Sequence, residues 1–121
     1  MASTVFERCG GFATVRRVVS AFYDRVLDSP TLSPHFEAIE MKTLIDHQTK
    51  FIASVMGGPA SFSDEALKRA HARLGISRAE FEEIVGLLRE TLEDFDVSAG
   101  DVAQVIGEVR RREPVIVSRY D

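Results

Sequence analysis

The sequence predicts a single all-α domain, and three observations support this prediction. Apolar residues recur three and four positions apart along most of the 121-residue chain, as they do on one face of a helix. Turns containing glycine or proline separate these stripes, and Ser77-Arg78-Ala79-Glu80 has the form of a helix-capping box. No convincing alternation of apolar and polar residues predicts a strand. We therefore expect one helical domain over residues 1–121.

The first half of the chain predicts two long helices. The first is expected to follow Gly10-Gly11 and to end near Asp28-Ser29-Pro30. Its apolar stripe is formed by Val15, Val18, Val19, Phe22 and Val26. A short helical turn is expected over residues 32–36, and a second long helix over about residues 41–56. Gly57-Gly58-Pro59 is a strong breaker that stops this second helix.

The second half predicts a short helix and two longer ones. The short helix begins near Ser61-Phe62-Ser63-Asp64, carries His71 and ends at Gly75, so packing or a ligand must hold it. The capping box then begins a long helix with the stripe Phe81, Ile84, Val85, Leu88, Leu92 and Phe95. A last helix begins at residues 98–101, with the stripe Val102, Val105, Ile106 and Val109, and Pro114 ends or redirects it.

Composition and charge exclude several classes of function. The chain is 45% hydrophobic and 28% charged, which is ordinary for a globular domain. Its net charge is -4 and it has no basic stripe, so we expect no nucleic-acid partner. One cysteine, Cys9, permits neither an internal disulfide nor a four-thiolate cluster within the chain. No apolar run approaches the ~20 residues of a membrane-spanning helix, and no secretory signal is evident. We expect a cytoplasmic protein without a membrane partner.

Two histidines and a glutamine lie on faces that the periodicity predicts to be buried. Each histidine belongs to a set spaced i, i+3, i+4, i+7, and the two sets are Leu44, His47, Gln48, Phe51 and Leu67, Ala70, His71, Leu74. A buried polar group without a partner costs roughly 1–3 kcal/mol. Two imidazoles that face inward from consecutive helices therefore indicate a bound metal centre.

Among metal centres, haem fits these residues better than zinc. Zinc requires about three protein ligands at a catalytic site, whereas one axial histidine suffices for haem. His71 is the stronger ligand candidate, because the carbonyl of Leu67 can accept a hydrogen bond from its second ring nitrogen. Apolar residues from several segments are candidates to line the haem pocket, although each is also an ordinary core residue: Phe36, Leu44, Phe51, Phe62, Leu67, Ile76, Phe81 and Val85.

Three side chains are candidate donors to a gas molecule bound at the iron. These are the hydroxyl of Tyr23, the amide of Gln48 and the ring N–H of His47. The alternative for Tyr23 is a half-buried ring with its hydroxyl in water. His47 has two alternatives, because it can bind the iron as a sixth ligand or lie at the surface edge beside Asp46. His35, after a proline, is expected at the surface.

Taken in order, these residues resemble the first group of the truncated haemoglobins, whose fold is a two-over-two helical sandwich around haem. The resemblance covers nearly the whole chain. It rests on Gly10-Gly11, Phe22-Tyr23-Asp24-Arg25-Val26-Leu27, Phe36, His47-Gln48 with Phe51, Gly57-Gly58-Pro59, and Ala70-His71 followed by Leu74-Gly75-Ile76.

The resemblance implies a role for each matching residue. His71 is the proximal iron ligand and Phe36 packs on the haem face, while the distal side is lined by Tyr23, Leu44, His47 and Gln48. The His47-Gln48 pair is similar to cyanobacterial and algal members, in which this histidine can bind the iron. Some of those members attach haem through a histidine in the last helix, but no histidine follows His71 here. Lys42 and Arg73 are candidate partners of the haem propionates.

The function implied by the resemblance is reversible binding of O2, NO and CO by haem b. Reaction of bound dioxygen with nitric oxide to give nitrate is the expected chemistry, and it requires an external reductase. One alternative is a haem-based gas-sensor domain of a larger signalling protein, in which residues 110–117 lead into an output domain. Another is a haem-free helical interaction module, which leaves His47, Gln48 and His71 without partners.

Overall fold

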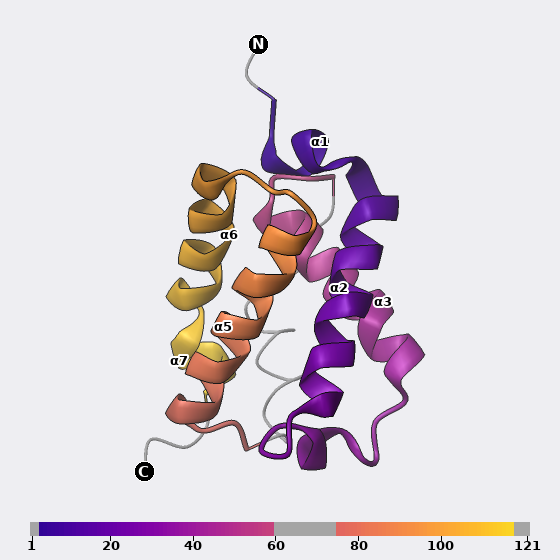
Figure 1. The fold of residues 1–121 in the computed structure, drawn as a ribbon, viewed down its shortest axis with the longest axis vertical. Helices are drawn as coiled ribbons and strands as arrows, with labels where there is room; N and C mark the ends of the chain where they lie inside the picture. Colours follow the sequence, from indigo (N-terminus) through magenta and orange to yellow (C-terminus); the bar gives the residue numbers. More distant parts are fainter. Residues whose placement is uncertain (1–2, 60–74, 118–121) are drawn as a thin grey trace.

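In the computed structural model, which describes residues 3–59 and 75–117, the chain folds into helices (Figure 1). In chain order the elements are α1 (Val5–Cys9), α2 (Gly11–Asp28), the 3-10 helix η1 (Ser33–Phe36), α3 (Met41–Val55), α5 (Arg78–Asp94), α6 (Ala99–Arg111) and α7 (Glu113–Ile116). The described ranges contain no strand, so the all-α prediction is confirmed. The helix expected to carry His71 lies outside the described residues.

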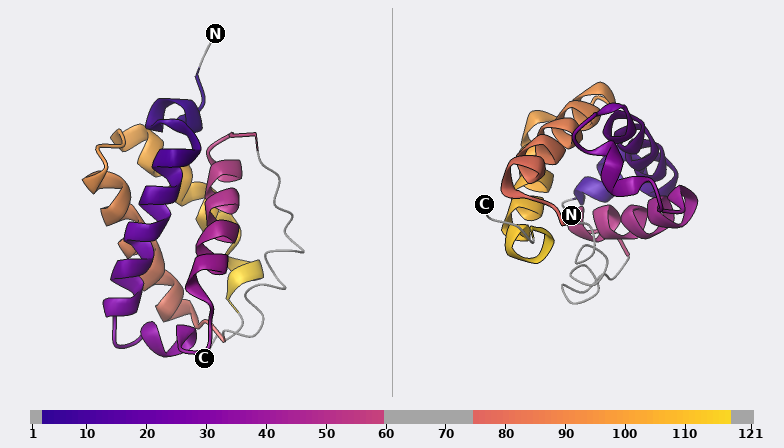
Figure 2. Two further views of the ribbon diagram at one scale, coloured as in Figure 1. Left: turned by 90° about the vertical axis from the view of Figure 1, so that its right-hand side faces the viewer. Right: turned by 90° about the horizontal axis from the view of Figure 1, so that it is seen from below.

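Two pairs of helices form the framework of the fold. Helix α2 packs against α3 in one pair, and α5 packs against α6 in the other. Contacts between α2 and α5, and between α3 and α6, join the pairs (Figure 2). The predicted stripes supply the packing surfaces, because Val15 and Val19 of α2, Phe81 and Leu92 of α5, and Val105 of α6 are almost completely buried.

Local sequence signals determine where the helices begin. The hydroxyl of Ser77 accepts a hydrogen bond from the Glu80 amide at 3.2 Å, and the Glu80 carboxylate accepts one from the Ser77 amide at 2.8 Å. This reciprocal pair confirms the predicted capping box at the start of α5. The same pattern at Thr4 and Glu7 begins α1, a helix that the periodicity of apolar residues did not predict because it is only five residues long.

The turn from α1 into α2 depends on two glycines. Gly10 and Gly11 both adopt positive φ angles, 115° and 81°, which residues other than glycine rarely adopt. A second glycine-rich turn ends α3, and there the ring of Phe6 packs on the backbone of Gly58. A Cβ atom at residue 58 would lie 2.6 Å from that ring, so only glycine fits at this position.

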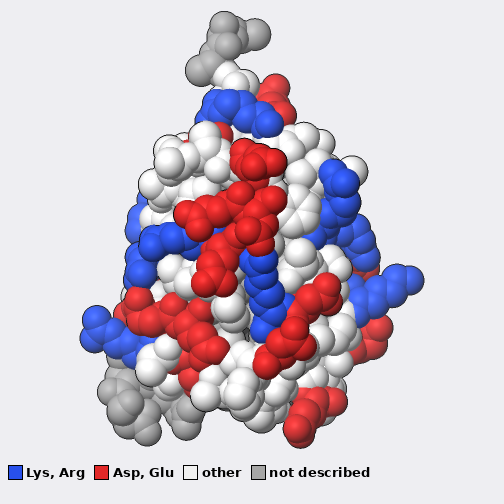
Figure 3. All heavy atoms as spheres, in the orientation of Figure 1, with Lys and Arg blue, Asp and Glu red and all other residues white. Residues whose placement is uncertain are grey.

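Charged side chains cover the outside of the framework and differ between its faces. Acidic residues gather over α5 and the adjoining part of α2 in the view of Figure 3. They include Asp24, Asp28, Glu90, Glu93 and Asp94, all of which are exposed. None of the helices within residues 3–59 and 75–117 is long and apolar enough to cross a membrane.

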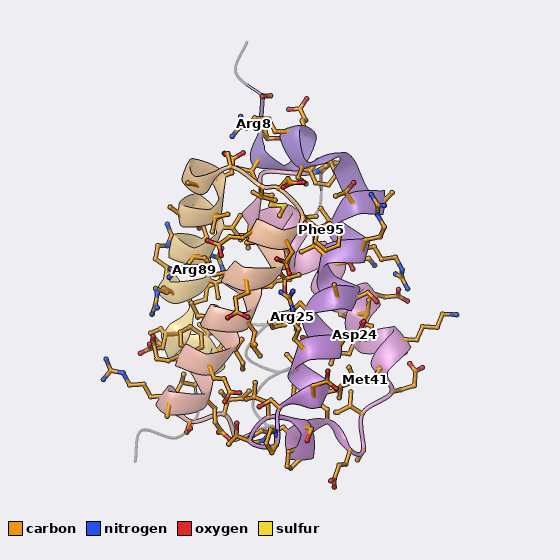
Figure 4. The ribbon with its side chains drawn as sticks, in the orientation of Figure 1. Arg8, Asp24, Arg25, Met41, Arg89 and Phe95 are labelled. Atoms are coloured by element: carbon orange, nitrogen blue, oxygen red, sulfur yellow. The ribbon has the colours of Figure 1, made fainter. Side chains whose placement is uncertain are left out.

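Polar contacts at the periphery tie the helices together. Arg25 extends from α2 toward α5 (Figure 4), where its Nη1 donates to the hydroxyl of Thr91 at 2.8 Å and its Nη2 pairs with Asp94. Arg8 of α1 forms a two-pronged contact with Asp101 of α6, with N···O distances of 3.0 and 2.7 Å. These contacts leave the inner faces of the helices to apolar side chains, and that space contains the candidate site.

Candidate functional site

An apolar cavity lies between the helix pairs. Its empty volume is about 750 Å³, counting space open to solvent. All of the longer described helices contribute to its wall, together with η1, α7 and the segment before α5. The lining residues in the described ranges are Val19, Phe22, Tyr23, Val26, Phe36, Leu44, Gln48, Phe51, Ile52, Ile76, Phe81, Ile84, Leu88, Val109 and Ile116.

The structure brings together most of the candidate site residues that it describes. Lining positions are occupied by Phe36, Leu44, Phe51, Ile76 and Phe81, and by the candidate donors Tyr23 and Gln48. Val85 is buried in the core but does not line the cavity. Phe62, Leu67, His71 and Arg73 lie outside the described residues. Lys42, the other candidate partner of the haem propionates, is exposed at the start of α3.

Several lining residues were predicted only as core. Val19, Phe22 and Val26 of α2 belong to the apolar stripe read from the sequence, as do Ile84 and Leu88 of α5. Periodicity shows which face of a helix points inward, but it cannot show whether that face meets another helix or an open cavity. The sequence therefore showed that these residues face inward, but it could not show that they line a cavity.

Tyr23 and Gln48 are the two polar side chains among the described lining residues. Each is only 7% exposed, and no hydrogen bond joins the Tyr23 hydroxyl or the Gln48 amide to another residue within the described ranges. The Tyr23 ring is held edge-on between Phe22, at a centroid distance of 4.9 Å, and Phe36, at 5.8 Å. Both side chains line the cavity, so their polar atoms are placed to bond a molecule that enters it.

Burial also determines the protonation state of Tyr23. Desolvation raises the pKa of its hydroxyl above the ordinary value near 10. The side chain is therefore neutral at physiological pH and retains its proton. Tyr23 and Gln48 both offer N–H or O–H donors to the cavity, since an amide also carries donor hydrogens.

His47 does not share the inward face of α3. The side chain is exposed and is not among the lining residues, which corresponds to the surface-edge alternative and not to an inward position beside Gln48. Gln48 marks the inward direction, and a residue one position earlier is rotated by about 100° around the helix axis. On that outer side Asp46 pairs with Arg16 of α2, and this contact lowers the pKa of the Asp46 carboxyl.

His35 was expected at the surface and instead joins two parts of the cavity wall. Its Nε2 lies 2.7 Å from the Glu80 carboxylate, and the two side chains are 17% and 16% exposed. The residues that follow them, Phe36 and Phe81, both line the cavity. The contact spans 45 residues of sequence, so no local pattern around His35 could have predicted it.

These residues fit a flat apolar group that carries a polar ligand on one side. Phenylalanines from η1, α3 and α5 supply broad apolar surfaces, while Tyr23 and Gln48 direct their donors from α2 and α3. Within residues 3–59 and 75–117, no group of three or more histidine, cysteine, aspartate or glutamate side chains is placed to hold a metal ion. The described wall therefore offers no multidentate metal site of its own.

Two helix pairs that enclose an apolar cavity with inward polar donors define a globin-type ligand-binding domain. Comparison with known proteins identifies the family. The model of the bacterial-like globins matches residues 4–117, and the chain belongs to this family, among the group 1 truncated haemoglobins. Membership implies haem-based gas binding.

Similar proteins come from bacteria and ciliates. The group 1 truncated haemoglobin GlbN of Mycolicibacterium paratuberculosis is 29% identical over 116 residues, which cover 96% of this chain and 85% of the relative. The group 1 truncated haemoglobin of Tetrahymena thermophila is 30% identical over 111 residues, which cover 89% of this chain and 92% of the relative. Among solved structures, the 2/2 haemoglobin of Synechococcus sp. PCC 7002, described with covalently attached haem, superposes with a TM-score of 0.88. It is 26% identical, with 97% of this chain and all of the other covered.

The His35–Glu80 contact predicts a measurable coupling in stability. Replacing His35 with Gln, Glu80 with Gln, and both together forms a double-mutant cycle in which the helix cap is retained, because glutamine also serves at this cap position. We expect a coupling free energy on the order of 1 kcal/mol from urea unfolding, because both side chains are largely shielded from solvent. The exposed pair Glu82 and Arg110 is the matched control and should couple by less than about 0.5 kcal/mol. A coupling for the His35 pair no larger than that of the control would contradict this role.

Proposed function

We propose that this chain is a haem b protein that binds O2, NO and CO reversibly, and that it converts nitric oxide to nitrate. The observation that carries the proposal is the buried pair Tyr23 and Gln48, whose donors face the cavity without partners in the described chain. Such donors stabilise a gas molecule that carries partial negative charge. The family relationship supports the presence of haem, and the donor pair supports tight binding of dioxygen.

The residues that would hold haem come from both halves of the chain. Phe36, Phe51 and Phe81 would contact its apolar surface, with Leu44 and Ile76 at neighbouring parts of the wall. His71 is the proposed proximal ligand by its match to the family. When bound, haem supplies an iron atom that binds a diatomic gas and exchanges one electron.

The protein's part in the proposed chemistry is to orient the gas and to exclude water. Tyr23 donates through its hydroxyl and Gln48 through its amide, so dioxygen held between them is retained long enough to meet nitric oxide. One dioxygen, one nitric oxide and one electron give nitrate. Formation of nitrate takes one electron from the protein and leaves the protein oxidised. Each turnover therefore requires an electron from a reductase.

The sensor alternative gains no support from the end of the described chain. Residues 110–117, which that alternative takes to lead into an output domain, fold into the end of α6 and into α7. Ile116 of α7 lines the cavity. This segment completes the pocket wall, so we retain gas binding with nitrate formation as the proposed function.

The proposal is tested by spectroscopy and rapid mixing. Protein expressed with haem supplied should show a Soret band, and the oxy form mixed with nitric oxide in a stopped-flow instrument should give nitrate and the ferric protein in a fast single step. Replacing His71 with Ala should weaken haem retention, whereas replacing Arg89, an exposed residue of α5 that does not line the cavity, with Ala should leave the Soret band intact. No Soret band in the unmodified protein would refute haem binding, and slow nitrate formation would refute the enzymatic part.

The donor pair predicts slow dioxygen release. Each hydrogen bond contributes roughly 0.5–1.5 kcal/mol, so Tyr23→Phe and Gln48→Leu should each accelerate dioxygen dissociation by about two- to tenfold. Thr49→Val is the matched control, because the Thr49 hydroxyl donates to the Ile45 carbonyl at 2.7 Å and does not line the cavity. The rates are measured by displacing dioxygen with carbon monoxide. Unchanged rates in both cavity variants would show that neither side chain holds the gas.

The exposure of His47 predicts an open sixth position on the iron. The ferrous, ligand-free protein should show one broad visible absorption band, and His47→Ala should leave the spectrum unchanged. The physical reason is that the imidazole lies on the outer side of α3, away from the cavity. Sharp, split bands that disappear in His47→Ala would instead mean that α3 rearranges to bring this histidine to the iron.

A further inference from the structure

A second concave surface lies on the outside of the α2–α3 pair. It is formed where the start of α2 faces the end of α3. Its apolar part is Phe12, Ala13 and Pro59, and its polar part is Arg16, Asp46, Thr49 and Lys50. This groove is wide and open to solvent, unlike the cavity between the helix pairs. Its composition, an apolar centre with a charged margin, is the usual composition of a protein–protein contact.

Phe12 is an exposed aromatic residue held in a fixed position. It is 42% exposed, yet its ring packs edge-on against Phe6 with centroids 4.9 Å apart and an interplanar angle of 74°. Phe6 in turn packs on the backbone of Gly58. Because these contacts already order the ring, a partner that covers Phe12 loses little side-chain entropy on binding.

The charge around this groove is positive, in contrast to the face formed by α5. Arg16, Arg17 and Lys50 are exposed, and Lys42 is exposed further along α3. Asp46 neutralises Arg16 alone. On the face seen in Figure 3, acidic side chains dominate over α5 and the adjoining part of α2, and basic side chains lie toward both edges, one of which is formed by α2 and α3. This distribution repels an acidic protein from α5 and orients it toward the groove.

The groove also lies behind one wall of the cavity. Thr49 and Lys50 of α3 line the groove, whereas Gln48 and Phe51, their neighbours in sequence, line the cavity. One helix, about 10–12 Å across, therefore separates a molecule docked outside from a cofactor held inside. Short-lived electron-transfer complexes characteristically use small contact areas of this kind.

From these observations we propose that the α2–α3 groove, lined by Phe12, Arg16 and Lys50 and with the exposed Arg17 next to Arg16 in sequence, is the docking surface for an acidic electron-donor protein. The inference rests on the proposed function, which consumes one electron in each turnover. Phe12 is the apolar anchor, and the basic margin accelerates encounter with the partner. The complex is weak and sensitive to salt, because exposed charges provide most of the attraction.

The test uses reduced flavodoxin, a small acidic flavoprotein, as the electron donor to the ferric haem-loaded protein. The second-order rate constant for reduction should fall steeply as ionic strength rises. Reversing two charges in Arg17→Glu/Lys50→Glu should lower it on the order of tenfold at low salt, and by much less at high salt. Phe12→Ser should lower the rate at every salt concentration. Arg89→Glu, a charge reversal of an exposed arginine on α5 (Figure 4), is the matched control and should change the rate by less than about twofold.

The outcomes separate this inference from the proposed function. Each variant is first compared with the unmodified protein by its Soret spectrum, thermal unfolding and reduction by dithionite, which needs no docking surface. Equal rates for Arg17→Glu/Lys50→Glu and Arg89→Glu would overturn the inference. So would sedimentation showing that the groove holds a second copy of the chain. Failure of the dithionite-reduced protein to bind dioxygen would refute the proposed function and leave the docking result standing.

Discussion

Two donors buried at the edge of an open apolar space are the constraint on which the rest of the structure depends. Tyr23 and Gln48 cannot satisfy each other or a neighbour within the described chain, and the cost of leaving them unpaired works against a collapsed core. The helices must therefore be held apart by contacts elsewhere. The cavity is open in the structure, and the donors gain a partner when a ligand enters it.

Polar contacts that join the helices lie away from the cavity. Arg25 ties α2 to α5, the pair of Arg8 and Asp101 ties α1 to α6, and His35 ties η1 to the start of α5. Each contact joins elements far apart in sequence, and none of these four residues lines the pocket. The inner surfaces thus remain apolar apart from the two donors, a division that suits a large flat cofactor with one polar side.

The sequence predicted the helices well and the site only in part. Capping residues such as Ser77 and Ser98 act over a few positions, so the starts of α5 and α6 could be found from local patterns. The inward direction of Gln48 also followed from periodicity. Periodicity misplaced His47 because this residue lies at the border of the inward face of its helix. Successive residues are rotated by about 100° around the helix axis, so His47 faces solvent although Gln48 faces the cavity. His35 was misjudged because its partner Glu80 is distant in sequence. Periodicity and local chemistry made His71 the stronger metal-ligand candidate, and the family resemblance added its proximal role.

Helix α3 has one face toward the cavity and another toward solvent, and this arrangement has a thermodynamic consequence. Gln48 and Lys50 are two residues apart on a single rigid element, so any displacement of that element alters the surroundings of both. If a ligand in the cavity shifts α3 and so changes the affinity of the groove for its partner by some factor, the partner must change the affinity of the cavity for its ligand by the same factor. This follows because coupling between two binding sites is reciprocal. The helix would then make gas affinity and partner affinity functions of each other, without any further moving part.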